Sequence, residues 1–259
     1  MKRARVLVMA AVLFAACPPA VPTTQPPVAR PPAWRDGELS IYHVLRNDSV
    51  LFETRVLLQL DEELVDARPV PTAVVTTTVE PIQSPTFFYD SSTVVLRRDS
   101  LIPLRSFRNL ETDLAIFDIQ TTYEPGQAVI RRQTLDGTDD VTCQTAGWTL
   151  DQDMVRTAFR AVPPDPGTEL RLTVVVPVEL RARDAAVLIL GTRLVVTPVD
   201  SIVCREYEYD TGTRKIRLWY EVGEPRRLVG LSDPVNGIVV KLVRYVPGRV
   251  DTAAVIPPR

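Results

Sequence analysis

The stretch LSIYHVLRNDSVLFETRVLLQL, residues 39–60, decides the fold class predicted for this chain. Apolar and polar side chains alternate on both sides of Asn47-Asp48-Ser49, a tripeptide with the composition of a tight turn. Alternation with a period of two is typical of half-buried strands, and two such runs joined by a short polar turn indicate an antiparallel hairpin. We therefore expect the folded part of the chain to open with a hairpin.

The same period continues through most of the remaining sequence, with proline and glycine between the runs. We expect further strands, rich in Val, Ile, Thr and aromatic residues, at 72–80, 86–90, 93–98, 102–108, 113–123, 127–134, 139–145, 169–179, 185–190, 193–199, 202–209, 213–221, 226–232 and 237–246.

One helix is predicted at residues 151–162. Asp151 could cap its first turn, and Pro163-Pro164 would end it. The apolar residues fall on one face of this helix: Met154, Val155, Ala158, Phe159 and Val162. Many antiparallel strands with one helix predict a mainly β fold, a curved antiparallel sheet or open half-barrel, with the helix against its concave face or plugging its mouth.

The first sixteen residues read as a signal peptide. Lys2, Arg3 and Arg5 precede an apolar run, residues 6–14, that is too short to span a bilayer as a helix. The run ends in LFAAC, which resembles the lipobox of bacterial lipoproteins, where a cysteine is acylated and becomes the new N-terminus. This resemblance implies lipidation at Cys17. The alternative is an ordinary secretory signal with an incidental cysteine, and both predict export.

Residues 17–33 follow as a lipidated, proline-rich tether. Proline removes backbone donors and holds a chain extended, so this segment would lift the folded part away from the lipid. We expect a β-rich domain at 34–248 and a flexible tail at 249–259. Since Pro18 is not the Asp that retains lipoproteins in the inner membrane of well-studied Gram-negative bacteria, the resemblance implies the outer membrane, with the domain facing the periplasm.

The charge of the chain argues against nucleic acid as a partner. Without the three basic residues of the signal, 27 Lys and Arg remain against 32 Asp and Glu. The pairs Arg97-Arg98 and Arg131-Arg132 are each followed closely by an acid or a turn, which indicates solvated strand ends rather than a phosphate-binding surface. We expect contact with the membrane through the lipid anchor alone.

Cys143 and Cys204 are the cysteines that remain after Cys17. An oxidising envelope would allow them to form a disulfide, but two buried free thiols fit the sequence equally well, and spacing alone does not decide between them. Two isolated cysteines and the single His43 do not make a metal-ligand cluster. We expect no metal and no cofactor.

The sequence contains no recognisable catalytic group. His43 lies inside a predicted strand, without a nucleophile motif elsewhere. Asp210-Thr211-Gly212 matches the triplet of aspartic proteases, but its charged neighbours are typical of a hairpin tip. The acidic run at 136–140 lacks the ligand number of a calcium loop, and a turn explains it. We expect a protein that is not an enzyme.

Several segments together resemble the family of domain of unknown function 3108, namely GELSIYHV, TVVLRRDSLIPLRSF, PPDPGTELRLTVVVP, VTPVDSIVCREYEYDTGTRKIRLWYEVGEPRRLVGLSD and GIVVKLVRY. That family consists of mainly β bacterial envelope proteins and lipoproteins. The resemblance implies a domain similar to the half-barrels of the lipoprotein carriers LolA and LolB, with a concave apolar face. It implies no functional residues.

Two functions fit these observations. The first is a non-catalytic binding module for an apolar or lipid-like ligand, which needs only a concave apolar wall. The second is a structural or interaction lipoprotein that docks another envelope protein or a polysaccharide through an exposed face or edge. An unfilled pocket would favour the first, and a filled interior with an exposed apolar patch would favour the second. The sequence names no ligand-binding residue.

Overall fold

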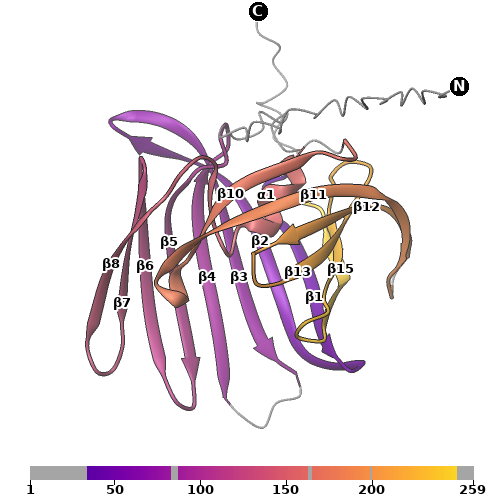
Figure 1. The fold of residues 1–259 in the computed structure, drawn as a ribbon, viewed down its shortest axis with the longest axis horizontal. Helices are drawn as coiled ribbons and strands as arrows, with labels where there is room; N and C mark the ends of the chain where they lie inside the picture. The colour runs from indigo at the N-terminus through magenta and orange to yellow at the C-terminus, as the bar shows by residue number, and fades with distance from the viewer. Residues whose placement is uncertain (1–33, 83–86, 163–164, 199, 250–259) are drawn as a thin grey trace, which may run out of the picture.

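The computed structural model describes residues 34–82, 87–162, 165–198 and 200–249. In these residues fifteen strands form one sheet in the order β8-β7-β6-β5-β4-β3-β2-β1-β15-β14-β13-β12-β11-β10-β9. Neighbouring strands are antiparallel, apart from the parallel pair β9 and β10. The sheet curves strongly, and its edge strands β8 and β9 are not paired with each other (Figure 1). The predicted class, a mainly β, open curved sheet with one helix, is confirmed.

The strands are β1 (Glu38–Arg46), β2 (Ser49–Val65), β3 (Arg68–Pro81), β4 (Phe88–Arg97), β5 (Pro103–Thr112), β6 (Ile116–Glu124), β7 (Gln127–Gln133), β8 (Thr138–Gln144), β9 (Thr149–Asp151), β10 (Glu169–Val176), β11 (Arg181–Val196), β12 (Ser201–Asp210), β13 (Lys215–Glu221), β14 (Leu228–Asp233) and β15 (Ile238–Val246). The helical segments are α1 (Val155–Ala158) and two short 3-10 turns, η1 (Phe159–Ala161) and η2 (Pro177–Glu179).

The opening hairpin is confirmed as β1 and β2. Asn47 and Asp48 have φ values of 51° and 61°, the left-handed conformation that a two-residue hairpin turn requires. Asn and Asp adopt it at low cost, which is why the sequence signal was strong. A second left-handed pair, Asp66 and Ala67, makes the equally tight turn between β2 and β3.

The predicted strands 86–90 and 93–98 are one strand, β4, and 185–190 and 193–199 are also one strand, β11. In β4 the polar residues Ser91 and Ser92 remain in register with β5, so they do not interrupt pairing. In β11 the pairing with β12 shifts between Ile189 and Thr192, so the glycine between them marks a bulge rather than a strand end.

The predicted helix at 151–162 is wrong in length. Asp151 belongs to β9 and pairs with Val175, and the α-helix spans only residues 155–158. No side chain caps it. Asp151 instead uses its carboxylate to accept the backbone N–H of Asp153 at 2.9 Å, within the turn that precedes α1. Because Asp151 pairs within the sheet, the residues expected to form the first helical turn form the end of β9 and a turn instead.

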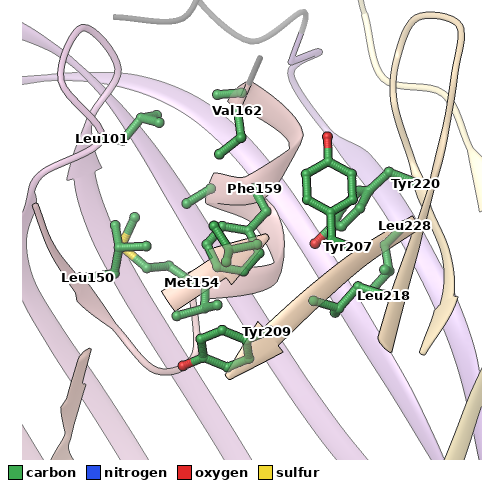
Figure 2. Close-up of a cluster of buried hydrophobic side chains, with 14 of the residues drawn as sticks. Leu101, Leu150, Met154, Phe159, Val162, Tyr207, Tyr209, Leu218, Tyr220 and Leu228 are labelled. Carbon is green, nitrogen blue, oxygen red and sulfur yellow. The ribbon is translucent and has the colours of Figure 1, made fainter. Parts of the chain in front are cut away.

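The apolar face predicted for this segment is nevertheless the centre of the core. Met154, Phe159 and Val162 are completely buried inside the curve of the sheet. Figure 2 shows them surrounded by side chains of both halves of the sheet, among them Leu101, Leu150, Tyr207, Tyr209, Leu218, Tyr220 and Leu228. The Phe159 ring meets Tyr209 edge-on at 5.5 Å. The segment thus fills one end of the half-barrel, as expected.

A second, smaller cluster lies at the unpaired side of the sheet. Ile119, Ala128, Ile130 and Cys143 of β6–β8 pack against Val175, and side chains on and after η2 cover them. Arg132 also donates to the carbonyl of Val178 at 3.4 Å. Side-chain packing therefore joins β6–β8 to the β10–β11 connection without strand pairing.

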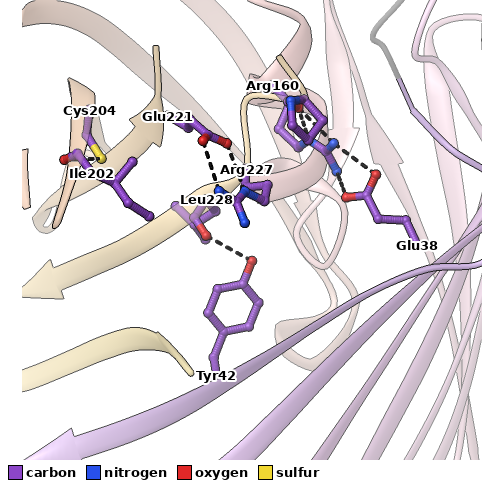
Figure 3. A network of polar contacts seen from close by, with 9 residues as sticks. Glu38, Tyr42, Arg160, Ile202, Cys204, Glu221, Arg227 and Leu228 are labelled. Atoms are coloured by element: carbon purple, nitrogen blue, oxygen red, sulfur yellow. Dashed lines mark hydrogen bonds and ion pairs between the residues drawn. The ribbon is translucent and has the colours of Figure 1, made fainter. Parts of the chain in front are cut away.

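Polar contacts tie the helical segment to the sheet (Figure 3). Arg160 of η1 binds the carboxylate of Glu38 at the start of β1, and Tyr42 donates to the carbonyl of Leu228. Near them Arg227 pairs with Glu221 through two hydrogen bonds. These contacts fix the end of the half-barrel that the helix occupies.

The signal peptide, Cys17, the tether and residues 250–259 lie outside the described residues. Asp36 and Arg249 exchange two backbone hydrogen bonds, so the paired structure extends one residue beyond the predicted domain end at 248. In the described ranges, no helix is long and apolar enough to cross a bilayer.

Candidate functional site

A cavity of about 440 Å³ lies between α1 and the inner face of the sheet. Strands from β1 to β5 and from β10 to β15 all contribute to its wall. Much of that wall is apolar, with valine the most frequent residue: Val44, Phe52, Val56, Val79, Val155, Val174, Val176, Ile216, Leu218, Leu231, Ile238 and Val240. Small-molecule sites have this volume, and polar and charged residues make up the rest of the wall. The core at the other end of the half-barrel is filled, so the helix separates packed interior from open pocket.

One side of the cavity carries a closed ionic network. Arg108 on β5 binds Asp90 of β4 through Nε and Nη2, at 2.9 and 2.6 Å. Its Nη1 lies 3.2 Å from both carboxylate oxygens of Asp153, in the turn before α1. All three side chains are at least four-fifths buried. Arg108 therefore bridges two carboxylates, a group that keeps one net negative charge, and anchors the helical segment to β4 and β5.

Behind this network Asp151 is completely buried. Burial, and secondarily the charge of Asp153, raises the pKa of Asp151 to about 6. The Tyr123 hydroxyl donates to Asp151 Oδ2 at 2.5 Å, which opposes part of that rise. Asp151 does not line the cavity. Its carboxyl group thus serves the fold rather than a ligand.

Four more arginines line the cavity. Arg46 at the end of β1 and Arg156 in α1 line the cavity, and neither guanidinium pairs with an acid within the described ranges. Arg183 of β11 binds Glu179 through Nη2, but its Nε is buried without a hydrogen-bond partner. Arg214 lies in the turn after β12 and pairs with Asp233. Altogether five arginines and three aspartates line the cavity, an excess of two positive charges in a chain whose net charge is −2.

Tyr209 on β12 stands among these arginines. Its hydroxyl has no hydrogen-bond partner in the part of the chain that the structure describes. Burial raises the pKa of Tyr209 to about 12, and the charges of Arg183, Arg214 and Arg156 act against that rise. The Tyr209 hydroxyl is therefore protonated near neutral pH and can donate a hydrogen bond, and the positive charges of these three arginines act on it.

Of the residues considered for catalysis, Thr211 lines this cavity, whereas His43, Asp210 and the acidic run at 136–140 do not. His43 pairs across β1 and β2 with Glu53, its Nε2 3.8 Å from the carboxylate. Asp210-Thr211-Gly212 is the tip of the β12–β13 hairpin, with Gly212 at a φ of 77°, as predicted for a turn. Asp136 and Gly137 likewise lie in the β7–β8 turn. Among the described residues, no group of three or more His, Cys, Asp or Glu is placed to hold a metal ion.

Cys143 and Cys204 are both buried free thiols, on β8 and β12. Their Sγ atoms contact different carbonyls, those of Leu180 and Ile202. The disulfide that the sequence allowed is not formed, and the alternative of two packed thiols holds, because the two strands belong to different parts of the sheet.

The arginine pair lies near the end of β7, as predicted, but only Arg131 is solvated: the side chains of Arg131 and Arg132 are 65% and 25% exposed. Arg131 and Arg132 face Asp140 and Asp139 on β8 and pair with them at 2.8 and 2.6 Å. These ion pairs also place charge on the edge of the sheet, where it opposes pairing with another strand.

Sequence reasoning named no residue as ligand-binding; Val155 and Thr211, which it considered for other reasons, both line the cavity. The signal that could have found some of the cavity residues is polarity at inward-facing strand positions. Arg108, for example, lies two residues after the buried Ser106 and faces the same side of β5. A charged residue that faces the core must be paired or must serve a ligand.

Comparisons with known proteins bear on the fold alone. No protein-family model matches the sequence, and no curated protein matches it. A solved structure is similar: the beta-barrel-like protein of domain of unknown function DUF1849 from Brucella abortus, with a TM-score of 0.52 and 10% identity over 83% of this chain and 98% of that chain. The likeness supports the barrel-like architecture and spans nearly all of the neighbour.

Proposed function

We propose that this protein is a lipid-anchored envelope protein whose β-domain is a non-catalytic binding module for an apolar or lipid-like ligand. The observation that carries the proposal is the cavity of about 440 Å³, whose wall combines valine, leucine and isoleucine with polar and charged side chains and which remains open beside a packed core. Its size and lining suit a small apolar ligand. A barrel-like neighbour of similar architecture is compatible with this role.

The arrangement of the carboxylates also supports binding over catalysis. An acid–base site needs a carboxyl group that can reach a substrate and exchange a proton. Asp90 and Asp153 both bind Arg108, Asp151 is enclosed, and Asp233 binds Arg214. Each of these groups is already committed to a structural contact.

The location belongs to the proposal as well. It depends on the signal peptide of residues 1–16 and on acylation of Cys17, which would place the domain at the outer membrane, facing the periplasm. The resemblance to the 3108 family also belongs to the proposal: the open curved sheet is compatible with it, although no protein-family model matches the sequence.

The test is native mass spectrometry, with lipid extraction, of the full-length protein isolated from its own envelope fraction. Thr77→Trp would place an indole in the cavity, whereas Thr78→Trp, one position along β3, would point it to the other face. We expect a co-purifying ligand in the wild type and in Thr78→Trp, and its loss in Thr77→Trp. An apo mass for the wild type that gains no lipid on titration would overturn the proposal.

A specific surface favours a second candidate, docking of another envelope protein. Leu194, Val203 and Val222 lie side by side on β11, β12 and the residue after β13, and they are 59%, 54% and 45% exposed. Val196 extends this apolar row. A photo-crosslinking residue at position 194 would capture such a partner, and one at position 193 is the control, because Arg193 lies on the other face over Trp219. Equal labelling from both positions would count against docking at this row.

A further inference from the structure

We infer that the ligand of the cavity is an anionic amphiphile, whose carboxylate or phosphate head group binds Arg156, Arg183 and the Tyr209 hydroxyl while its apolar chain lies along the valine-rich wall. This inference depends on the proposed binding function and specifies its ligand class. The elements that meet here are α1, β11 and β12.

The first argument is unsatisfied donor capacity. The Arg183 Nε is buried and has no acceptor, although Nη2 of the same side chain binds Glu179 at 2.8 Å. Arg156 is exposed and its guanidinium has no ion pair, and the Tyr209 hydroxyl has no hydrogen bond, in the ranges that the structure describes. Of the three groups, Arg183 Nε is the one whose burial without a partner costs free energy; the other two offer free donors at the cavity wall. A ligand with acceptor oxygens would satisfy all three groups together.

The second argument is charge. The cavity wall carries two more positive than negative charges, and the aspartates on it are bound to Arg108 and Arg214. The positive charge that is left belongs chiefly to Arg46 and Arg156. Both residues are exposed, so solvent screens part of this charge, but the positive excess still favours an anion over a neutral or cationic ligand. Guanidinium groups also match the planar geometry of a carboxylate and the oxygens of a phosphate.

The third argument is that apolar and cationic side chains lie next to each other on the same wall. Ile216 lies opposite Tyr209 on the neighbouring strand, and Val174 lies opposite Arg183. A ligand with one charged end and one apolar chain can contact both kinds of side chain at once. A purely apolar ligand would leave Arg183 Nε buried without an acceptor.

The test measures binding of matched probes to the full-length chain by equilibrium dialysis, below the concentration at which the probes aggregate. The probes are hexadecanoic acid, its uncharged methyl ester, and a hexadecanoyl glycerol phosphate. We expect the acid or the phosphate to bind about tenfold more tightly than the ester, since a hydrogen bond to a charged group is worth about 1.5–3 kcal/mol. The stronger of the two anions identifies the head group.

The variants separate head-group recognition from packing. Arg156→Ala and Tyr209→Phe should reduce the preference for the anion to less than threefold while leaving affinity for the ester unchanged. Arg244→Ala is the control, because Arg244 is an exposed, unpaired arginine on β15 that does not line the cavity. It should keep the full preference.

The outcomes distinguish the two proposals. If the ester binds as tightly as both anions, the cavity binds lipids but the inferred head-group site is wrong. If Arg156→Ala weakens the ester and the acid equally, that arginine acts through packing, and the inference is again wrong. If no probe binds the wild type, the proposed binding function itself fails.

Discussion

Arg160 and Glu38 lie 122 positions apart in the sequence and form a buried, two-pronged ion pair, with N–O distances of 2.6 and 3.1 Å. Their side chains are 8% and 2% exposed. Arg160 also donates to the carbonyl of Pro225 at 2.9 Å, so one guanidinium joins η1, β1 and the loop before β14. The contact positions the helical segment that bounds the cavity.

Removing one member of the Arg160–Glu38 pair should strongly destabilise the folded protein. Arg160→Ala leaves the Glu38 carboxylate buried and unpaired, and we expect a loss of about 3–5 kcal/mol in the free energy of unfolding. Arg171→Ala removes an exposed pair with Glu169 and should cost less than about 1 kcal/mol. Urea unfolding followed by circular dichroism measures both. Equal small losses would show that the buried pair is not needed for stability.

The backbone of Val240 on β15 lies so close to position 230 on β14 that only glycine fits there without a shift. A Cβ atom at this position would lie 2.7 Å from the carbonyl oxygen of Val240 and 3.5 Å from the Trp219 ring. Gly230→Ala should therefore destabilise the protein by about 1–3 kcal/mol, because the β14–β15 pairing must shift. Gly191→Ala is the matched control, since a Cβ there meets nothing within 4 Å. Thermal unfolding that is unchanged in both variants would contradict the geometry.

The two buried cysteines should be slow to react in the folded protein. Burial raises the pKa of Cys204 to about 12, so its reactive thiolate is scarce near neutral pH. We expect iodoacetamide to modify Cys143 and Cys204 only after unfolding, in protein kept without reductant. Peptide mapping checks this, and a cross-linked peptide that contains both residues would contradict the free thiols seen in the structure.

The strands could be predicted because the alternation of apolar and polar residues within each run depends only on neighbours in the sequence. The β1–β2 hairpin had the clearest signal, since alternation and an Asn-Asp turn point to the same structure. The helix was overpredicted because Asp151 satisfies two patterns, a cap and a strand end, and only its pairing with Val175 decides between them. That partner is not a neighbour in sequence.

The cavity could not be predicted, for a related reason. Its wall draws residues from Val44 to Val240, and each one looks like an ordinary alternating strand position. What makes a pocket is the incomplete filling of the curve by α1, a property of sheet curvature and helix length together. Sheet curvature and helix length also decide that Arg108 meets acidic partners whereas Arg156 has no ion pair among the described residues.

Asp151 should give the folded protein a distinctive dependence on pH. Its pKa is raised from 3.8 to about 6, so the folded state binds this proton more tightly than the unfolded state does. The resulting stabilisation is complete below about pH 4 and is lost as the pH rises to about 6, a change on the order of 3 kcal/mol. The side chain in Asp151→Asn cannot ionise, so this variant does not lose that stabilisation as the pH rises.

The measurement compares urea unfolding of the wild type and Asp151→Asn at several pH values between 4 and 7.5. The other carboxyl groups titrate in both proteins, so the difference between the two isolates Asp151. We expect the wild type to lose stability relative to the variant as the pH rises from 4 to 6, and the difference to stay constant above that. Parallel curves over the whole range would show that Asp151 has an ordinary pKa, and that the Tyr123 hydroxyl and the Asp153 N–H offset its burial.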